Sequence, residues 1–194
     1  MNSKTRNRFL TAQAMVGIII WAFLAPAAAR AGRWMPLDVS SKEYEIKAAF
    51  IFNFAQFTQW PDSAFSSRDA PFVVAVIGDD PFGPALQQVM DGRSVAGHPI
   101  IVKHFDSPGQ IHGCHVLYVP ASEEDHLTDI FNAVGNQPIL TVGETSKFLW
   151  AGGIIQFLIA DGKIRFEIAP DAADKAGLRL SSRLLSLAKI FKKH

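Results

Sequence analysis

Cysteine is nearly absent from this sequence, which contains one, Cys114, among 194 residues. A lone cysteine excludes any disulfide within the chain, so the fold must be stabilised by its hydrophobic core. The composition permits such a core, since 48% of the residues are hydrophobic. We expect Cys114 to be a buried thiol, and an intermolecular bridge is the alternative.

The signatures of hydrolases, metalloproteases and nucleotide-binding loops are also absent. The sequence contains no G-x-S-x-G, no H-E-x-x-H, no G-x-G-x-x-G and no P-loop pattern. The only thiol lies at the start of an apolar strand, without an obvious base beside it to activate it. We therefore predict that the protein is not an enzyme and needs no cofactor.

The first residues have the composition of a secretory signal peptide. A basic start precedes an apolar run from Phe9 to Leu24, and small residues follow the run. The run is shorter than the ~20 residues that cross a bilayer, and alanines at its end are typical of a cleavage site. We predict export from the cytosol and removal of residues 1–31, with cleavage after Ala29 or Ala31. A retained N-terminal anchor is the alternative.

Excess positive charge is missing from the chain that remains. Removal of the leader takes away four basic residues and no acidic one, which leaves 15 Lys and Arg against 18 Asp and Glu. Such a balance implies no nucleic-acid partner and no anionic membrane surface. The remaining 163 residues suit one domain and are too few for two closing lobes.

An aromatic-rich helix is predicted at the start of this domain. Ser40 and Glu43 form a capping-box pattern, and the helix is expected to extend to about Trp60. Glu43 and Lys47 form an i,i+4 pair that we expect on the solvent side. Large apolar residues at spacings of three and four predict the core-facing stripe; these are Ile46, Phe50, Phe54 and Phe57.

Short apolar runs then alternate with helical ones. Strands are predicted at 72–77, 99–104, 114–119 and 138–142, with helices at 82–90 and 123–134. Asp161-Gly162 predicts a hairpin between strands at 154–160 and 164–169. A closing helix follows from about Asp171, and Gly177 is a point where it can be interrupted. The pattern predicts an α/β fold, a three-layer αβα sandwich with a mostly parallel sheet, a C-terminal antiparallel hairpin and a closing helix.

The segment from Gly78 to Gly83 is the best candidate for a ligand site, because it directly follows a predicted strand. Two carboxylates there disfavour a phosphate, and Asp80 before Pro81 is also a good helix start. A cluster of histidines near Cys114 suggests a metal site, but strand alternation directs Cys114 and His115 to opposite faces. We predict no metal site.

Short segments spread over residues 43–191 carry a resemblance to a known family. They are Glu43–Phe54 with Trp60-Pro61, Gly78–Gly83, Cys114–Leu117, Leu140–Val142, Gly152-Gly153, Arg165–Ile168 and Ala176–Leu185. In this order they resemble the YfiR-like family of exported regulatory proteins. Several ordered segments together are more specific than any one of them.

The resemblance implies a single domain over residues 43–192, after a signal peptide at 1–31 and a linker at 32–42. It implies a periplasmic, homodimeric regulator that binds the periplasmic sensory region of an inner-membrane diguanylate cyclase and represses it. Cyclic-di-GMP signalling and biofilm formation then fall, and an outer-membrane lipoprotein can draw the repressor away. Members of the family carry further cysteines that pair, whereas only Cys114 is present here.

A repressor needs differential affinity for one state of its target and no chemistry of its own. We expect its anchors among apolar and cationic residues left uncovered by the core. The candidates for this partner interface are Phe52, Trp60, Phe65, Leu178, Arg179, Arg183 and Leu185.

The alternative function is small-molecule sensing that acts on a sensor kinase or another membrane receptor. A ligand would then be held by polar side chains beside the strand-end loop. The candidates for this site are Asn53, Asp79, Asp80 and Arg165.

Overall fold

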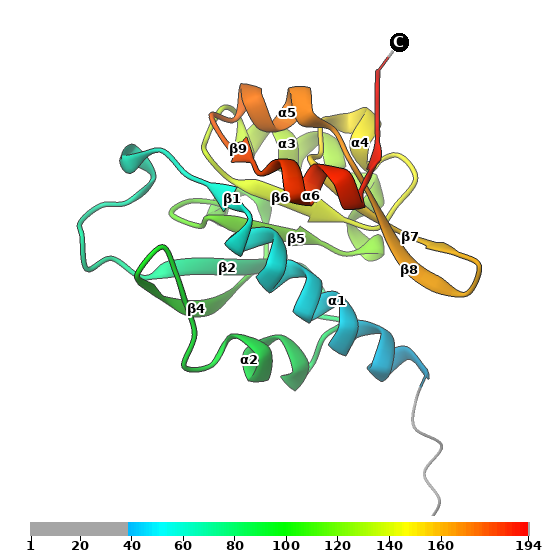
Figure 1. The fold of residues 1–194 in the computed structure, drawn as a ribbon, viewed down its shortest axis with the longest axis horizontal. Helices are drawn as coiled ribbons and strands as arrows, with labels where there is room; N and C mark the ends of the chain where they lie inside the picture. Colours follow the sequence, from blue (N-terminus) through cyan, green and yellow to red (C-terminus); the bar gives the residue numbers. More distant parts are fainter. Residues whose placement is uncertain (1–38, 194) are drawn as a thin grey trace, which may run out of the picture. The chain divides into compact units, whose positions relative to one another are not determined.

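The computed structural model of the protein describes residues 39–193 (Figure 1). The predicted signal peptide and the larger part of the predicted linker lie outside the described residues. Eight strands form the main sheet, in the order β10-β8-β7-β6-β5-β2-β4-β3. The strands β2, β4, β5, β6 and β7 are parallel to their neighbours in this group, whereas β8 is antiparallel to β7.

The strands of the main sheet have these bounds: β2 Phe72–Ile77, β3 Ser94–Val95, β4 His98–Phe105, β5 Val116–Val119, β6 Leu140–Gly143, β7 Ile155–Ala160, β8 Lys163–Ile168 and β10 Lys189–Ile190. The predicted mostly parallel sheet with a C-terminal antiparallel hairpin is confirmed. At the hairpin turn, Asp161 and Gly162 have φ values of 52° and 67°, the left-handed pair that an Asp-Gly turn favours.

Helices cover both faces of the sheet, as an αβα sandwich requires. The front face, toward the viewer in Figure 1, is covered by α1 (Val39–Gln56), α2 (Pro84–Met90) and α6 (Ser182–Leu187). The back face is covered by α3 (Leu127–Val134) and α4 (Phe148–Ala151). Each residue of β2 is buried, and alternate residues enter two separate hydrophobic cores.

The remaining elements are short: α5 Pro170–Lys175, β1 Thr58–Gln59, β9 Arg179–Leu180, and 3₁₀ turns at Asp62–Ala64, Pro108–Gln110 and Ala121–His126. The strands β1 and β9 pair with each other and form a second, two-stranded sheet. This pairing brings the end of α1 next to the start of α6.

The first helix differs from the prediction at both ends. Ser40 lies within the helix, so it is not the N-cap that the capping box predicts. The helix ends at Gln56, four residues before Trp60, because the chain turns there into β1. The hydroxyl of Thr58 donates a hydrogen bond to the carbonyl oxygen of Phe54, at 2.8 Å, and closes the last turn.

The predicted closing helix is divided into α5, β9, α6 and β10. Gly177 has a φ of 71°, a left-handed conformation that ends the helical path after α5. Ser181 then starts a new helix, since its Oγ accepts a hydrogen bond from the backbone N–H of Leu184 at 3.2 Å. The interruption that the sequence allows at Gly177 is therefore present, whereas the short strands β9 and β10 were not predicted.

Candidate functional site

One side of α1 carries large side chains that the described fold leaves partly uncovered. Ile46, Phe50, Asn53 and Phe57 follow one another at spacings of three and four, so they share this side. Ile46 is 42% exposed, and Phe50 and Phe57 are half-buried. The predicted core stripe is therefore rotated, and the residues that α1 buries are Lys47, Ala48, Ile51, Phe54 and Ala55.

The β7–β8 hairpin lies next to this side of α1. The ring of Phe50 is centred 6.0 Å from that of Phe157 and 5.7 Å from that of Phe166. Ile159 and Ile164 pair nearer the hairpin tip and point to the same sheet face as these two rings. Because no described helix covers the tip, Ile159 is 64% exposed.

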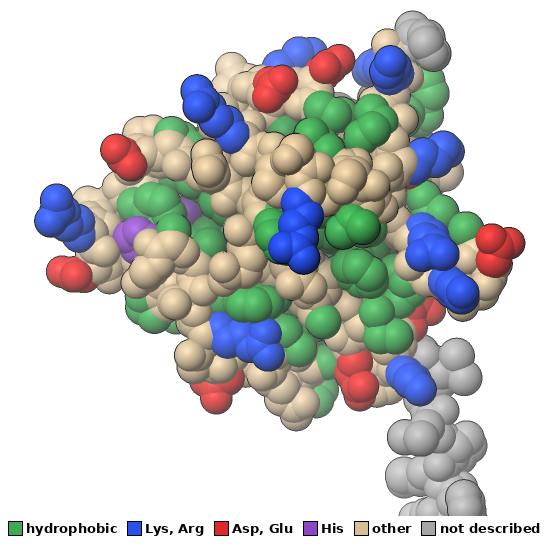
Figure 2. Space-filling model, viewed as in Figure 1, with side chains coloured by type: hydrophobic (Ala, Val, Ile, Leu, Met, Phe, Trp, Pro, Cys, Tyr) green, Lys and Arg blue, Asp and Glu red, His purple; other side chains and the backbone are tan. Residues whose placement is uncertain are grey.

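The helix α6 completes this surface. Its Leu187 is 70% exposed, and the guanidinium of Arg183 lies 5.4 Å from the centre of the Phe57 ring. Figure 2 shows hydrophobic side chains gathered between α1, α6 and the hairpin, with Lys and Arg side chains among them. We define the α1–α6 face as Ile46, Phe50, Phe57, Ile159, Ile164, Arg183 and Leu187.

The structure places the C-terminal interface candidates in three different environments. Arg183 belongs to the α1–α6 face, and Leu185 is half-buried on the same helix. Arg179 is exposed in β9, opposite Gln59 of β1. Leu178 is 1% exposed and packs in the front core, so it is not available to a partner. The expectation that Leu178 belongs to the surface is corrected, because the turn at Gly177 directs this side chain inward.

The three aromatic interface candidates lie away from the α1–α6 face. Phe52 projects from the opposite side of α1, where the guanidinium of Arg93 covers its ring at 4.5 Å. Trp60 packs edge-on against Phe72, with their ring centres 4.9 Å apart. Phe65 stacks on His98, with their centres 4.0 Å apart. Side chains of the same chain therefore cover part of each ring.

The predicted ligand residues do not converge on one pocket. Asp79 is exposed after β2, and Asp80 accepts a hydrogen bond from the backbone N–H of Phe82 at 2.8 Å. Asp80 therefore caps a turn, and α2 begins later, at Pro84. Asn53 lies on α1 beside the α1–α6 face. Arg165 lies on β8, which three strands separate from β2, a span of about 19 Å.

Asp80 also contacts His104, whose Nε2 lies 2.8 Å from Oδ2 of the carboxylate. The side chain of His104 is half exposed, so this contact is solvent-screened. The two residues join the ends of β2 and β4, which are neighbours in the sheet. The Asp80 carboxylate thus has partners on both of its oxygens within the chain.

A buried charge cluster that the sequence analysis missed lies at the carboxyl end of β6. The Lys47 ammonium lies 2.5 Å from the Glu144 carboxylate and 2.6 Å from that of Glu43. Glu144 also accepts hydrogen bonds from the Tyr44 hydroxyl at 3.2 Å and from the Ala121 backbone N–H at 3.1 Å. Lys47 is 4% exposed, so its expected position on the solvent side was wrong.

The charges of this cluster hold α1 against the sheet and do not form a reactive site. Burial alone lowers the pKa of Lys47, but hydrogen bonds to Glu144 and Glu43 outweigh burial, so the pKa is raised. Burial, and then the negative charge of Glu144, raises the pKa of Tyr44. The lysine is therefore charged and the tyrosine neutral at physiological pH, and neither group is poised for proton transfer.

Cys114 and His115 point into different cores, as strand alternation predicts. Cys114 is buried in the back core, and burial raises the pKa of its thiol to about 12. His115 stacks on Phe65 and Phe72 in the front layer, and its Nδ1 accepts a hydrogen bond from the Val73 backbone N–H at 3.0 Å. Across residues 39–193, no three His, Cys, Asp or Glu side chains are grouped to hold a metal.

Comparison with known protein families identifies the family to which the chain belongs. A family model described as YfiR/HmsC-like matches residues 44–189, which is most of the sequence. None of the helices in the described part of the chain is long and apolar enough to cross a membrane. The matched segment includes α1 from Tyr44 onward, both cores, the hairpin and α6. The protein therefore belongs to the YfiR/HmsC-like family, a family of periplasmic regulators, not catalysts, in cyclic-di-GMP signalling.

Proposed function

We propose that the protein is exported to the periplasm, binds the sensory region of an inner-membrane diguanylate cyclase, and represses that cyclase. Family membership supports a regulator in cyclic-di-GMP signalling. The signal-peptide pattern of residues 1–31 supports export, with cleavage after Ala29 or Ala31. The repressed cyclase makes less cyclic-di-GMP, so biofilm formation is restrained.

The single observation that carries this proposal is the exposure of large apolar side chains on the α1–α6 face. Leu187 and Ile159 are 70% and 64% exposed, and they come from α6 and β7, which are separate elements of the fold. Exposed apolar residues gathered on one face are typical of a protein-binding surface. Such residues become energetic anchors when a partner removes them from water.

Repression follows from binding that distinguishes two states of the cyclase. If the α1–α6 face fits the inactive sensory region tenfold better than the active one, binding shifts the equilibrium by about 1.4 kcal/mol. This mechanism requires no catalytic group. An outer-membrane lipoprotein that competes for the repressor would restore activity, since sequestration of the repressor frees the cyclase.

A homodimer is compatible with this mechanism. Two copies of the α1–α6 face in one dimer would engage both protomers of a dimeric cyclase, and the second contact would be intramolecular. We therefore expect the exported protein to be dimeric in solution and to bind the cyclase with matching stoichiometry.

Direct binding between purified proteins tests the proposal. The exported protein is purified from the periplasm of an expression host and titrated against the periplasmic regions of the native host's cyclases and sensor kinases. We expect binding to a cyclase region, a loss of at least about tenfold in affinity for Ile159→Asp, and no loss for Ile101→Asp.

The two substitutions are matched, because both place a charge on an exposed isoleucine of the sheet. Ile101 lies in β4 and is 37% exposed, outside the α1–α6 face. Binding to a kinase region and to no cyclase region would redirect the proposal to the alternative partner. Equal affinity of both variants would refute the role of the α1–α6 face.

A further inference from the structure

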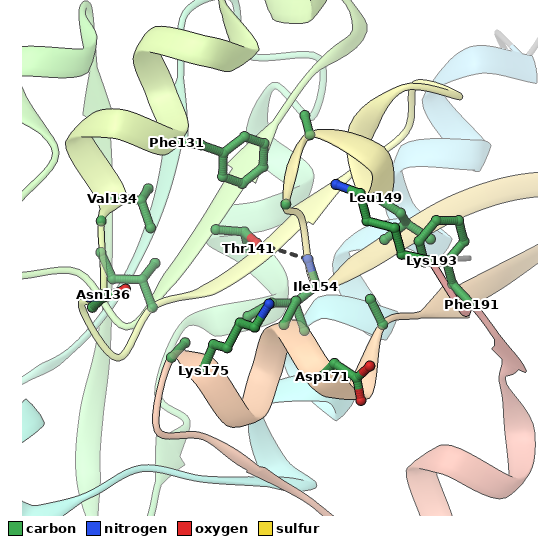
Figure 3. A pocket seen from close by; sticks show the side chains of 17 residues that line it. Phe131, Val134, Asn136, Thr141, Leu149, Ile154, Asp171, Lys175, Phe191 and Lys193 are labelled. Atoms are coloured by element: carbon green, nitrogen blue, oxygen red, sulfur yellow. Dashed lines mark hydrogen bonds between the residues drawn. The ribbon is translucent and has the colours of Figure 1, made fainter.

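A cleft lies on the back of the sheet, on the side away from the α1–α6 face. It has a volume of about 460 Å³ and lies between α3, α4, α5 and the last residues of the described chain (Figure 3). Its volume falls in the range of about 300–1,000 Å³ that is usual for small-molecule sites. None of the residues proposed above for ligand or partner binding lines this cleft.

The walls of the cleft combine apolar and polar surface. Its large apolar lining residues are Phe131, Val134, Ile139, Leu149, Ile154 and Phe191. Several of them are also part of the back core, so the walls belong to the packed fold and are formed before any ligand arrives. A ligand with an apolar body would lose water contact where it lies against these residues.

The polar groups of the cleft favour a negatively charged head group. Figure 3 shows the Lys175 side chain extending from α5 toward Thr141 and Ile154. The Thr141 hydroxyl oxygen accepts a hydrogen bond from the Ile154 backbone N–H at 3.1 Å, so the hydroxyl proton is available for donation. The Lys175 ammonium and the Thr141 hydroxyl are thus two donors in the lining of the same cleft.

The charged residues that line the cleft also favour a negatively charged ligand. Lys175 and Lys193 are the basic lining residues and Asp171 is the acidic one. Within residues 39–193, neither lysine forms an ion pair, and Lys193 donates its hydrogen bond to the Trp150 carbonyl oxygen at 3.0 Å. The Lys175 ammonium is therefore not neutralised by a carboxylate of the described chain.

We propose that this cleft binds a small monocarboxylate with an apolar body, the chemistry of a medium-chain fatty acid. One ammonium and one hydroxyl match the two oxygens of a carboxylate. The aliphatic chain would lie among the rings of Phe131 and Phe191 and the aliphatic side chains between them.

Calorimetric titration of the exported protein with sodium octanoate tests the proposal. We expect saturable binding of octanoate at one site per chain, and no saturable binding of acetate, which lacks the apolar body. Octylammonium has the same chain with the opposite charge, and we expect it to bind at least about fivefold more weakly. Absence of octanoate binding up to about 5 mM would overturn the proposal.

Two variants locate the site. Ala151→Phe adds a ring at an exposed residue of α4 that lines the cleft, so it should abolish octanoate binding without disturbing the core. Lys175→Met should weaken octanoate about fivefold and leave octylammonium no weaker. The matched control is Lys163→Met, at an exposed position of the hairpin, which should change neither. Octanoate binding that survives both cleft variants would place the ligand elsewhere and refute the site.

Discussion

At the carboxyl ends of β2 and β6, the charged groups Asp80 and Glu144 each have several partners within the chain. On the α1–α6 face, by contrast, Ile159 and Leu187 have most of their surface in contact with solvent. The carboxyl edge is where ligands usually bind in an open α/β sheet. Here the side chains at that edge join α1 to the sheet. The large apolar side chains that remain exposed lie instead on the α1–α6 face.

The carboxyl edge of the sheet therefore serves the stability of the fold, and the α1–α6 face serves the binding of a partner. A buried charge whose partner is removed strongly destabilises a fold, whereas an exposed apolar residue contributes little to folding. Changes at the carboxyl edge should therefore alter unfolding without altering the partner surface. Changes on the α1–α6 face should alter partner affinity in a protein that remains folded.

The largest expected effect is on stability, from Glu144→Ala. This change removes one of two carboxylates from the buried Lys47 ammonium and leaves the Tyr44 hydroxyl without its partner. We expect the free energy of unfolding in urea to fall by about 3 kcal/mol. The control, Glu124→Ala, breaks the exposed pair with Lys147 and should change it by less than about 1 kcal/mol. Equal losses of unfolding free energy in the two variants would show that the buried cluster does not stabilise the packing of α1 on the sheet.

The next effect is on partner affinity, from Ile159→Asp combined with Leu187→Asp. Both side chains are proposed anchors, so we expect the dissociation constant for the cyclase region to rise at least about 30-fold. The free energy of unfolding should change by less than about 1 kcal/mol, because both residues are exposed. If the double variant is folded and its affinity is unchanged, the α1–α6 face does not bind the partner.

A smaller effect on affinity is expected from Arg183→Glu. The guanidinium covers Phe57 and is the cation of the α1–α6 face, so charge reversal should weaken partner binding about fivefold. Surface charges are screened, and the difference between variant and native protein should therefore shrink between low and high salt. A difference that does not change with salt would assign the effect to lost packing on Phe57 and not to charge.

The smallest effect concerns pH and His115. Burial is the main cause that lowers the pKa of His115 in the folded protein, so the unfolded chain takes up its proton first as the pH falls. The contribution of the neutral His115 to stability is fully present above the pKa of about 6.5 that histidine has in the unfolded chain. This contribution is lost as the pH falls through the lower pKa that His115 has in the folded protein. We expect His115→Gln to reduce the loss of stability between about pH 7.5 and 5, measured by urea unfolding.

The control is the same substitution at the exposed His112, His112→Gln, which removes an imidazole that the fold does not bury. The variants differ in burial and not in the residue type that is removed. An identical pH profile for native protein and His115→Gln would show that burial of this imidazole has no consequence for stability.

Much of the fold follows from local signals in the sequence. Asp161-Gly162 fixes the hairpin through its left-handed turn, and the apolar run of residues 72–77 becomes the fully buried strand β2. The closing helix was predicted from its helical apolar spacing, with Gly177 as a point where it can be interrupted. Gly177 and Ser181 interrupt it, and the pairing of β9 with β1, more than 100 residues away, makes the interruption stable.

The candidate site follows from the sequence only in part. Arg183 is recognisable from its position in the last helical segment, but exposure depends on what the rest of the chain covers. Ile46 is apolar and helically spaced, yet the fold turns it to the surface. Lys47 is paired with Glu43 nearby, but the partner that buries it, Glu144, lies 97 residues away. Pairings between distant segments are tertiary and leave no local signal.

Repression through the α1–α6 face can be measured as the level of cyclic-di-GMP in the native host. The gene is deleted, and the deletion is complemented with the native protein, the Ile159→Asp/Leu187→Asp variant or the Ile101→Asp control, at equal periplasmic abundance. We expect cyclic-di-GMP to rise on deletion, the native protein and Ile101→Asp to reverse the rise, and the double variant not to reverse it. Restoration by the double variant, or no rise on deletion, would contradict repression through the α1–α6 face.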